Sequence, residues 1–475
     1  MSAIRKLSLA TTLLCQTLVT CLPTAEVSID SKTRFQQVDG FGCAEAFQRA
    51  EDVLGKEGLS PENQNLVFDL LFSEETGAGF TILRNDIGSS NSSISNLVNS
   101  IEPFSPGSPN APPHYVWNGY DSGQFPMAQR AYERGLQHLY AEAWSAPGYM
   151  KTNDDENNGG YICGVTGETC STGDWKQAYA DYLVQYYKFY YESGVKITQL
   201  GFLNEPQWAS DYATMLSNGT QAADFIRVLA ATIEREGIDV ELTCCDSFGW
   251  EQQEEMLPAL QLKDENGKSA EDYLSVITGH GYASAPTSPL TTTLRTWMTE
   301  WAGDGDYVPY TFYENGSNNE GMTWATNIQV AFVNANVSAY LYWIGAENST
   351  SASALINLLN NEVVPTKRFY SYASFSKFVR PGAVRIDASS SDDQVTVSAF
   401  ENENGVLATQ VINNSTSDYE LEFSLNVQGE SHLTAVPYIT NNEFDLTQLN
   451  SIEVTRDGQF SATIPGKTLI SFVIQ

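Results

Sequence analysis

Histidine and basic residues are scarce in this 475-residue chain. It holds four His, and 25 Lys plus Arg stand against 58 Asp plus Glu, which gives a formal net charge of −33. Such an acidic protein repels nucleic acid and anionic lipid, so we expect neither nucleic acid nor a membrane as partner. The few His and the lack of any Cys-x-x-Cys pair exclude the common zinc patterns, and we expect neither a metal nor an organic cofactor.

Long apolar runs are also missing beyond the N-terminus. A basic start at Arg5 and Lys6 precedes an apolar stretch at residues 7–22 that contains Ser, Thr and Gln. This stretch is too short and too polar to span a membrane, and it predicts a signal peptide at residues 1–25, cleaved near Ala25. We therefore expect a secreted, extracellular and monomeric protein. Asn-x-Ser/Thr glycosylation acceptors support secretion, and they occur at Asn91, Asn218, Asn315, Asn336, Asn348, Asn413 and Asn414.

Cysteine is sparse too, with seven in the chain, two of which leave with the signal peptide. Cys163 and Cys170 flank a Gly- and Thr-rich loop, which predicts a local disulfide in an oxidising compartment. Cys244 and Cys245 are adjacent in an apparent strand, where their side chains would point to opposite faces. We expect these two and Cys43 to be buried, inert thiols.

Strand-like and helix-like segments alternate over residues 38–379, in about eight units. This alternation predicts parallel strands, either closed into a barrel or arranged as a doubly wound sheet. Strands are expected at residues 38–42, 79–85, 139–145, 197–204, 240–246, 274–279, 295–299 and 339–343. Helices are expected at residues 60–75, 174–193, 220–236, 250–262, 321–334 and 368–379.

The pattern of apolar and polar residues changes at residue 380. Residues 380–475 form short alternating segments separated by Asn, Gly and Asp turns, which is typical of an antiparallel β-sandwich. Residues 26–37 are also strand-like and are expected to pair with this tail. The sequence therefore predicts a catalytic unit at 38–379 and a side sandwich at 380–475.

Two glutamates end apolar strands of the predicted barrel. Glu205 lies in Asn204-Glu205-Pro206 after the segment ITQLGFL, and Glu300 ends RTWMTE three strands later. The ends of strands four and seven face each other across a barrel mouth. Retaining glycoside hydrolysis needs two carboxyl groups about 5–5.5 Å apart, one as acid/base and one as nucleophile. The pair predicts such an active site, whereas two salt-bridged surface residues are the alternative.

Four stretches of the sequence, two of which contain these glutamates, resemble glycoside hydrolase family 30, in particular its fungal xylanase and glucuronoxylanase branch. They are GFGCAEAF at 40–47, WSAPGYMKTND at 144–154, FLNEP at 202–206 and TEW at 299–301, and the junction SFSKFVRPGAVRI at 374–386 agrees. The resemblance implies a (β/α)8 TIM barrel with an attached antiparallel β-sandwich. It also implies retaining cleavage of xylan-type polysaccharide or xylo-oligosaccharide, with Glu205 as acid/base and Glu300 as nucleophile.

Polar residues at other strand ends fit supporting roles. Asn204 offers an amide to a sugar hydroxyl, Tyr282 is placed to hydrogen-bond Glu300 and hold it ionised, and His280 lies beside them. Arg84 is expected to neutralise the carboxylates. The alternatives are a structural ion pair for Arg84 and a satisfied core histidine for His280.

Aromatic residues also end strands. Trp144 and Trp343 resemble the aromatic walls that family members place around a sugar, because an aromatic face makes apolar contact with a pyranose ring. Packing at the top of the barrel is the alternative. Trp208 and Tyr149 are further candidates for outer subsites.

Bacterial glucuronoxylanases of the family hold an acidic branch with a basic residue on the last barrel loop. Here that loop, at 345–363, contains no Lys or Arg. Arg49 is a candidate substitute, or a surface residue paired with Glu51 or Asp52. The sequence therefore leaves open a glucuronoxylanase, a general endo-xylanase and an exo-acting xylanase. A hydrolase of β-glucan or another β-glycoside, and a carbohydrate-binding protein without catalysis, are further alternatives.

Overall fold

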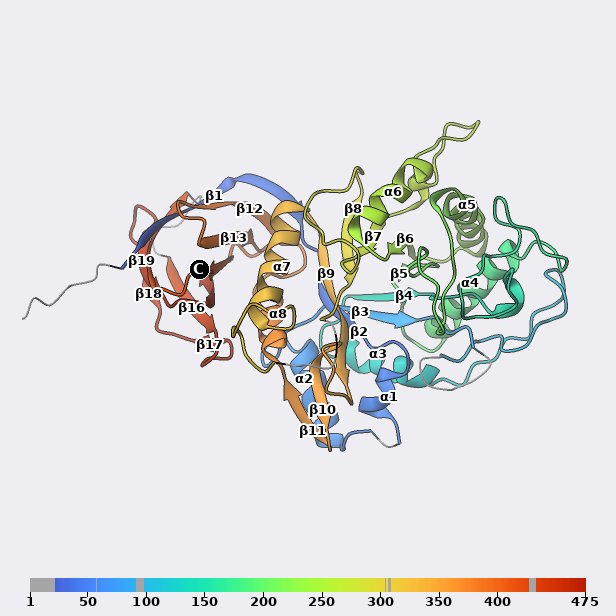
Figure 1. Ribbon diagram of the computed structural model, residues 1–475, viewed down its shortest axis with the longest axis horizontal. Coiled ribbons are helices and arrows are strands. Elements are labelled where there is room, and N and C mark those ends of the chain that lie inside the picture. The colour runs from blue at the N-terminus through green and yellow to red at the C-terminus, as the bar shows by residue number, and fades with distance from the viewer. Residues whose placement is uncertain (1–21, 57, 91–97, 304, 306–308, 427–432) are drawn as a thin grey trace, which may run out of the picture.

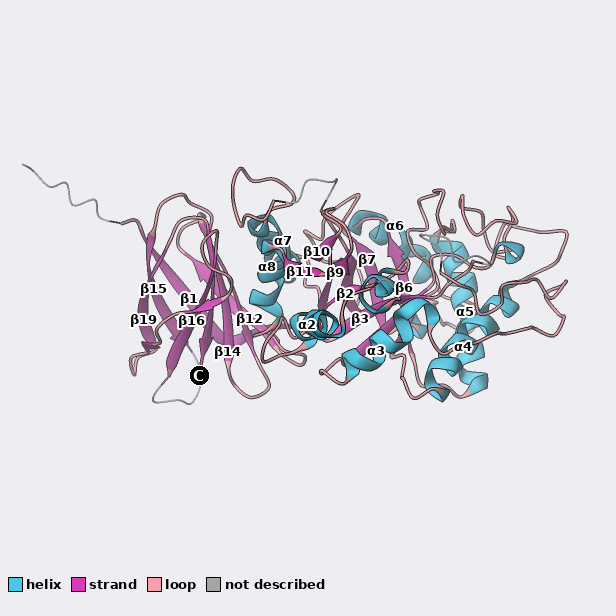
Figure 2. Ribbon diagram, turned by 90° about the horizontal axis from the view of Figure 1, so that it is seen from below, coloured by secondary structure: helices cyan, strands magenta, loops and turns pink. Residues whose placement is uncertain are grey.

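The computed structural model describes residues 22–56, 58–90, 98–303, 305, 309–426 and 433–475. Two β-sheet units lie side by side, with helices α7 (Gly321–Asn334) and α8 (Lys367–Ser376) between them (Figures 1 and 2). The larger unit is a barrel surrounded by helices, and the smaller one consists of strands. In the described part of the chain, no helix has the length and apolarity to cross a bilayer.

The larger unit is a closed parallel barrel. Its strands pair in sequence order from β2 to β9, and β9 pairs with both β8 and β2, which closes the ring. The closed barrel settles the choice that alternation alone left open between a barrel and a doubly wound sheet. The strands are β2 (Gly40–Ala44), β3 (Ile82–Asp86), β4 (His138–Glu142), β5 (Gln199–Leu200), β6 (Glu241–Ser247), β7 (Val276–His280), β8 (Arg295–Glu300) and β9 (Ala339–Glu347).

The barrel interior is divided along its axis. Near the start of the strands an apolar cluster fills it, made of Ile82, Val276, Trp297, Ala339 and Leu341. At the carboxyl ends the buried residues are polar or charged, which is where TIM-barrel active sites lie; they include Asp86, Glu142, Asp246, His280 and Glu300.

Helices cover the outside of the barrel. Ser60 caps α2, accepting a hydrogen bond from the backbone N–H of Asn63. Asn218 and Gln221 form a capping box at the start of α5. The short helices α1 and α3 were not predicted from the sequence. Besides α7 and α8, the helices are α1 (Arg49–Leu54), α2 (Pro61–Phe72), α3 (Gln124–Tyr132), α4 (Lys176–Glu192), α5 (Gly219–Glu236) and α6 (Trp250–Leu260).

The last barrel loop contains regular strand structure. Within it, β10 (Ala354–Leu359) pairs in parallel with β9, and β11 (Glu362–Pro365) folds back antiparallel onto β10. The barrel sheet therefore extends past its closing strand toward α2.

The smaller unit is a second sheet, which is antiparallel except for one pair. In it β1 (Thr24–Gln37) lies between β12 (Val384–Ser390) and β15 (Tyr419–Asn426), antiparallel to the first and parallel to the second. Because β1 begins at Thr24, the cleavage position expected near Ala25 falls inside this strand, and residues 1–21 lie outside the described residues. The other strands are β13 (Val395–Glu401), β14 (Leu407–Asn413), β16 (Thr434–Thr440), β17 (Thr447–Gln448), β18 (Ile452–Glu453), β19 (Gln459–Ile464) and β20 (Thr468–Ile474).

Buried polar contacts join the two units. Gln410 on β14 donates to the carbonyl of Ser374 on α8, and the Ser471 hydroxyl on β20 donates to the same carbonyl. Gln329 on α7 bonds Ser398 of β13 and the carbonyl of Gln410. The sheet is therefore packed directly onto the helices that cover the barrel.

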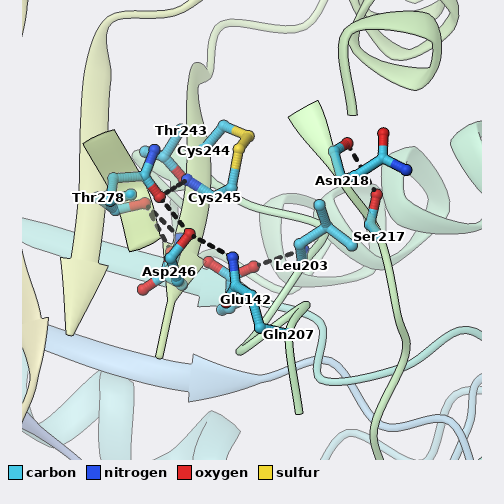
Figure 3. The surroundings of a disulfide bond; sticks show 12 residues. Glu142, Leu203, Gln207, Ser217, Asn218, Thr243, Cys244, Cys245, Asp246 and Thr278 are labelled. Atoms are coloured by element: carbon cyan, nitrogen blue, oxygen red, sulfur yellow. Dashed lines mark hydrogen bonds between the residues drawn. A yellow bond between two sulfur atoms is a disulfide. The ribbon is translucent and has the colours of Figure 1, made fainter. Parts of the chain in front are cut away.

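The cysteines confirm one expectation and correct another. Cys163 and Cys170 form the predicted disulfide. Cys244 and Cys245, expected as separate thiols on opposite faces of a strand, are instead bonded to each other, with Cα atoms 3.0 Å apart (Figure 3). The peptide bond between Cys244 and Cys245 is cis, and the ladder between β6 and β7 shifts register just after Cys245. Cys43 is a buried free thiol, as expected.

Candidate active site

The two predicted glutamates meet at the carboxyl end of the barrel. Glu205 follows β5, the fourth barrel strand, and Glu300 is the last residue of β8, the seventh. One carboxylate oxygen of each, together with one ring nitrogen of His280, all lie within 4.8 Å of one another. Both side chains are almost fully buried, at 5% and 4% exposure. This bound is compatible with the separation of about 5–5.5 Å at which retaining glycosidases hold their two carboxyl groups.

The backbone around Glu205 is fixed by its neighbour in the barrel. The Glu205 N–H donates to the carbonyl of Asp246 on β6, at 2.8 Å, and the residue adopts a left-handed φ of 48°. Such a conformation is uncommon for a residue with a side chain and clusters at functional sites. The turn after the short strand β5 therefore sets where the carboxyl group points.

Glu300 is held from both sides by hydrogen-bond donors. Arg84, from the end of β3, makes an ion pair with Oε2, and the Tyr282 hydroxyl donates to Oε1 at 3.0 Å. The expected contact between Tyr282 and Glu300 is therefore present. These two donors fix the position of both Glu300 oxygens at the mouth of the barrel.

Arg84 is a buried ion-pairing residue, and its partners belong to the site. Besides Glu300, it donates through Nη2 to Asn204 Oδ1 at 2.6 Å and to Asp246 Oδ1 at 3.4 Å. Its guanidinium lies 4.3 Å from the ring centroid of Trp144. The amide oxygen of Asn204, predicted to meet a sugar hydroxyl, is thus engaged by Arg84.

His280 bridges two carboxylates. Its Nδ1 lies 3.0 Å from Glu205 Oε1, its Nε2 lies 3.2 Å from Asp246 Oδ1, and Glu300 Oε2 is 3.8 Å from Nε2. Burial disfavours the imidazolium, but the charges of Glu300, Asp246 and Glu205 outweigh it and raise the pKa of His280 to about 9. The residue is buried, yet its partners are the acidic groups of the site.

Asp246 is a central residue that the sequence reasoning missed. Burial works against its charge, but Arg84 and His280 hold the pKa of its carboxyl well below the usual range. The hydroxyls of Thr278, Thr299 and Tyr140 also donate to it, and Figure 3 shows it directly after Cys245 and beside Thr278. Its signal in the sequence was an acidic residue closing the apolar strand VELTCC.

Three other buried acids at this end of the barrel, Glu142, Asp86 and Glu205, have a raised pKa. Burial, with the charge of nearby Asp246, raises the pKa of Glu142 well above its ordinary value. Burial raises that of Asp86 in the same way. For Glu205, burial and the charge of Glu300 raise the pKa and outweigh the hydrogen bond from His280. Glu205 is therefore the member of the pair that is suited to hold a proton.

Glu205, His280 and Glu300 are close enough to be tested as a metal site. A histidine ligand is a neutral imidazole with a free nitrogen lone pair, whereas both nitrogens of His280 face carboxylates. The guanidinium of Arg84 on Glu300 would also repel a cation. This donor set fits proton transfer better than metal coordination.

A cleft of about 370 Å³ opens above the two glutamates. On one side Phe47, Trp144, Tyr212 and Trp343 pack together, with the rings of Trp144 and Trp343 5.8 Å apart. The cleft is lined by Phe47, Arg49, Trp144, Glu205, Trp208, Tyr212, Phe248, Tyr282, Glu300 and Trp343.

The opposite wall is a stack of three aromatic rings. Trp208, which is 45% exposed, stacks on Phe248 at 5.4 Å, and Phe248 stacks on Tyr282 at 5.7 Å. The sequence indicated Trp208 and Tyr282, but it missed Phe248, Phe47 and Tyr212, which lie on loops whose course no pattern fixes.

Two outlying candidates differ in outcome. Tyr149 donates a hydrogen bond to the carbonyl of Glu102 and packs against Trp175. It is not among the described residues that line the cleft. Arg49 does line the cleft, and it forms an ion pair with Glu347 at 2.9 Å, a partner that the sequence did not indicate. Glu347 also accepts hydrogen bonds from Ser349, Ser351 and Ser353 on the last barrel loop.

The predicted glycosylation acceptors differ in accessibility. Asn413 is fully buried, and its Nδ2 donates to three backbone carbonyls, of Ser417, Ile464 and Pro465, which makes it a poor acceptor. Asn91 lies outside the described residues. Asn414 is half-buried, and the exposed candidates are Asn218, Asn315, Asn336 and Asn348.

Comparisons with known proteins show the family of the chain. Residues 24–257 match the model for O-glycosyl hydrolase family 30, and residues 382–472 match the family 30 β-sandwich domain. The structure of the catalytic domain of a GH30 xylanase C from Talaromyces cellulolyticus is 41% identical. It covers 95% of this chain and 100% of that one, with a TM-score of 0.86.

More distant curated relatives span several activities. Glucuronoxylanase XynC of Bacillus subtilis is 24% identical over 71% of this chain and 74% of its own length. A putative glucosylceramidase 1 of Caenorhabditis elegans is 25% identical over 82% and 76%. With two family models and a relative of 41% identity along nearly its whole length, the chain belongs to glycoside hydrolase family 30.

Proposed function

We propose that this glycoside hydrolase is a secreted retaining enzyme that cleaves β-1,4-xylosidic bonds in xylan-type polysaccharide or xylo-oligosaccharide. The observation that carries the proposal is the pair of carboxyl groups facing one cleft within 4.8 Å, one paired with Arg84 and the other buried with a raised pKa. Their unlike environments separate a nucleophile from an acid.

In the first step, a carboxylate oxygen of Glu300 attacks the anomeric carbon of the sugar in the cleft. The bond from that carbon to the leaving oxygen breaks, and the leaving oxygen takes the proton of Glu205. Tyr282 and Arg84 keep Glu300 ionised and aimed until the new bond forms. The product is a glycosyl ester of Glu300 and an ionised Glu205.

In the second step, Glu205 acts as the base. Esterification removes the negative charge of Glu300, which had raised the pKa of Glu205, so Glu205 now stays ionised. It takes a proton from a water molecule whose oxygen attacks the anomeric carbon. The ester bond breaks, Glu300 is restored as carboxylate, and the configuration at the anomeric carbon is retained.

The aromatic walls favour a sugar chain as substrate. Trp144 and Trp343 on one side and the stack from Trp208 to Tyr282 on the other offer apolar faces to pyranose rings. Xylan is the preferred chain because the relative with 41% identity is a xylanase. An exo-acting xylanase, or a hydrolase of β-glucan or another β-glycoside, uses the same two carboxylates and is the alternative.

Substitution of each glutamate tests the reaction. Glu300→Gln should abolish xylan hydrolysis, and Glu205→Gln should cripple it but recover turnover with azide or an activated leaving group, because azide replaces the water that no longer has a base. Glu241→Gln, at the other end of the barrel, is the control and should keep wild-type activity. Near-normal hydrolysis by Glu300→Gln would overturn the assignment. Binding of xylan without turnover by the wild-type protein would favour the carbohydrate-binding alternative.

Arg49 gives a test of branch recognition. It is the basic residue of the described cleft lining, so Arg49→Ala should lower kcat/KM on glucuronoxylan more than on unbranched xylan. The products released from glucuronoxylan, arabinoxylan and linear xylo-oligosaccharides by the wild-type enzyme would show endo or exo action in the same assay. Equal losses on both xylans would remove Arg49 from branch binding.

A further inference from the structure

The buried site holds two basic groups and three acidic groups in direct contact. Arg84 touches Glu300, Asp246 and Asn204, and His280 touches Glu205 and Asp246. His280, Arg84 and Asp246 are fully buried, so water does not screen these charges. Which group carries each proton must then be decided by the cluster itself.

We propose that Asp246 keeps His280 as a permanent imidazolium, and that His280 thereby confines the catalytic proton of Glu205 to its second oxygen, Oε2. The proposal rests on the proposed function for the role of that proton. It makes Asp246 and His280 positioning residues for the acid/base, acting without contact to the substrate.

The hydrogen bonds of the imidazole support this placement. A neutral imidazole has one N–H and one lone pair, so with its N–H on Asp246 it would draw the acid proton of Glu205 onto Oε1, 3.0 Å from Nδ1, and away from the leaving oxygen. An imidazolium donates at both nitrogens and satisfies Glu205 Oε1 and Asp246 Oδ1 together. Once Oε1 accepts this N–H, the acid proton of Glu205 belongs on Oε2.

The charges of the surrounding elements point the same way. Three acidic residues face His280: Glu205 after β5, Asp246 on β6 and Glu300 on β8. Arg84 on β3 forms ion pairs with Asp246 and Glu300. Tyr282 lies with its ring 6.1 Å away and contributes no charge while its hydroxyl donates to Glu300. The raised pKa of His280, about 9, agrees with this arrangement.

The proposed protonation states keep the net charge of the buried cluster constant over the two steps. Before the attack, Arg84 and His280 carry two positive charges, and Asp246 and Glu300 carry two negative ones, while Glu205 is neutral. In the glycosyl-enzyme, Glu300 is an uncharged ester and Glu205 is the second anion. The buried cluster is neutral in both states only if His280 stays protonated, and an unbalanced buried charge is costly.

Nitrogen NMR on 15N-histidine-labelled enzyme tests the proposal directly. The chain has only four histidines. His138 serves as an internal reference because burial lowers its pKa, and His280→Gln assigns the remaining signal. We expect both nitrogens of His280 to be protonated from pH 5 to pH 8, in the free enzyme and in the intermediate trapped with an activated 2-fluoro xylobioside.

A single neutral tautomer of His280 at pH 6 in the free enzyme would overturn the proposal, as would a loss of its proton on trapping. Failure to trap any glycosyl-enzyme would overturn the retaining mechanism instead. The free-enzyme spectrum would still decide the state of His280, so the two failures are distinguishable.

A pair of variants separates charge from structure. Asp246→Asn removes the anion and should lower the titration midpoint of His280 by about 1–3 pH units, the usual effect of a close opposite charge. Thr278→Val removes a hydrogen bond to Asp246 without changing charge, and it should leave the midpoint in place even if it lowers Tm. An unmoved midpoint in Asp246→Asn, read from the same NMR titration, would contradict the role of Asp246.

Discussion

At the scale of single residues, the surroundings of each carboxyl group decide its protonation, because buried acids in one site differ in the direction of their pKa shift. Asp246 and Glu142 are both fully buried acids, at the ends of β6 and β4, the two strands that flank β5. Arg84 and His280 lower the pKa of Asp246 despite its burial, whereas burial and the charge of Asp246 raise the pKa of Glu142. Separating acids and bases in this way is what allows one barrel to hold both a proton donor and a nucleophile.

Tyr282→Phe removes one hydroxyl from the site and keeps the ring in its stack. The hydroxyl donates to Glu300 at 3.0 Å, and a hydrogen bond to a charged group contributes about 1.5–3 kcal/mol. We expect kcat/KM on xylan to fall by about 10- to 100-fold, with Tm changed little. Trp208→Phe, on the same stack, is the comparison and should raise KM more than it lowers kcat. Wild-type kcat in Tyr282→Phe would show that Glu300 does not need this bond.

His280 also makes stability depend on pH. Its folded pKa of about 9 lies above the unfolded value of about 6.5. The stability that it contributes is therefore fully present below pH 6.5 and is lost as pH rises through 9. The free energy of unfolding of the wild type should exceed that of His280→Gln by more at pH 6 than at pH 10, as measured by urea titration. An equal gap at both values would mean that His280 is neutral in the folded protein.

At the scale of elements, the end of a helix can serve two purposes. Asn218 caps α5 through Oδ1, which accepts from the N–H groups of Thr220 and Gln221, while a glycan would attach at Nδ2. Asn218→Asp keeps the cap and removes the acceptor, so it should retain Tm but lose any glycan mass at this position. Asn218→Ala removes both and should cost about 0.5–2 kcal/mol of stability. Equal destabilisation by the two variants in thermal melts would assign the effect to the glycan.

At the scale of the whole molecule, the first and last parts of the chain build one sheet. β1 lies between β12 and β15, and its residues Val27 and Ile29 are in the core of that sheet. Because β1 leads directly into the barrel strand β2, and Gln329 and Gln410 join the units, the two should unfold together. We expect one calorimetric transition for the full chain, and residues 38–379 alone should be insoluble. Two resolved transitions would show that the units are thermodynamically independent.

Much of the architecture was readable because it depends on local pattern. The predicted helix at 321–334 coincides with α7, and the change in pattern at residue 380 precedes β12 at Val384. The sequence did not predict helices α1 and α3 or the strand pair β10–β11, because each is short and stabilised by contacts with distant residues. Asn361 at the β10–β11 turn, for example, accepts a hydrogen bond from the N–H of Ser60 at the start of α2.

The sequence by itself determined the alternation of strands and helices, the side sheet and the place of the two glutamates at strand ends, since periodicity and strand ends are local properties that packing leaves unchanged. Only the tertiary structure decided that Asp246 joins Arg84 to His280, that Cys244 bonds Cys245, and that Arg49 pairs with Glu347. Charges and protonation depend on distances between residues far apart in the chain, and those distances exist only after the barrel closes.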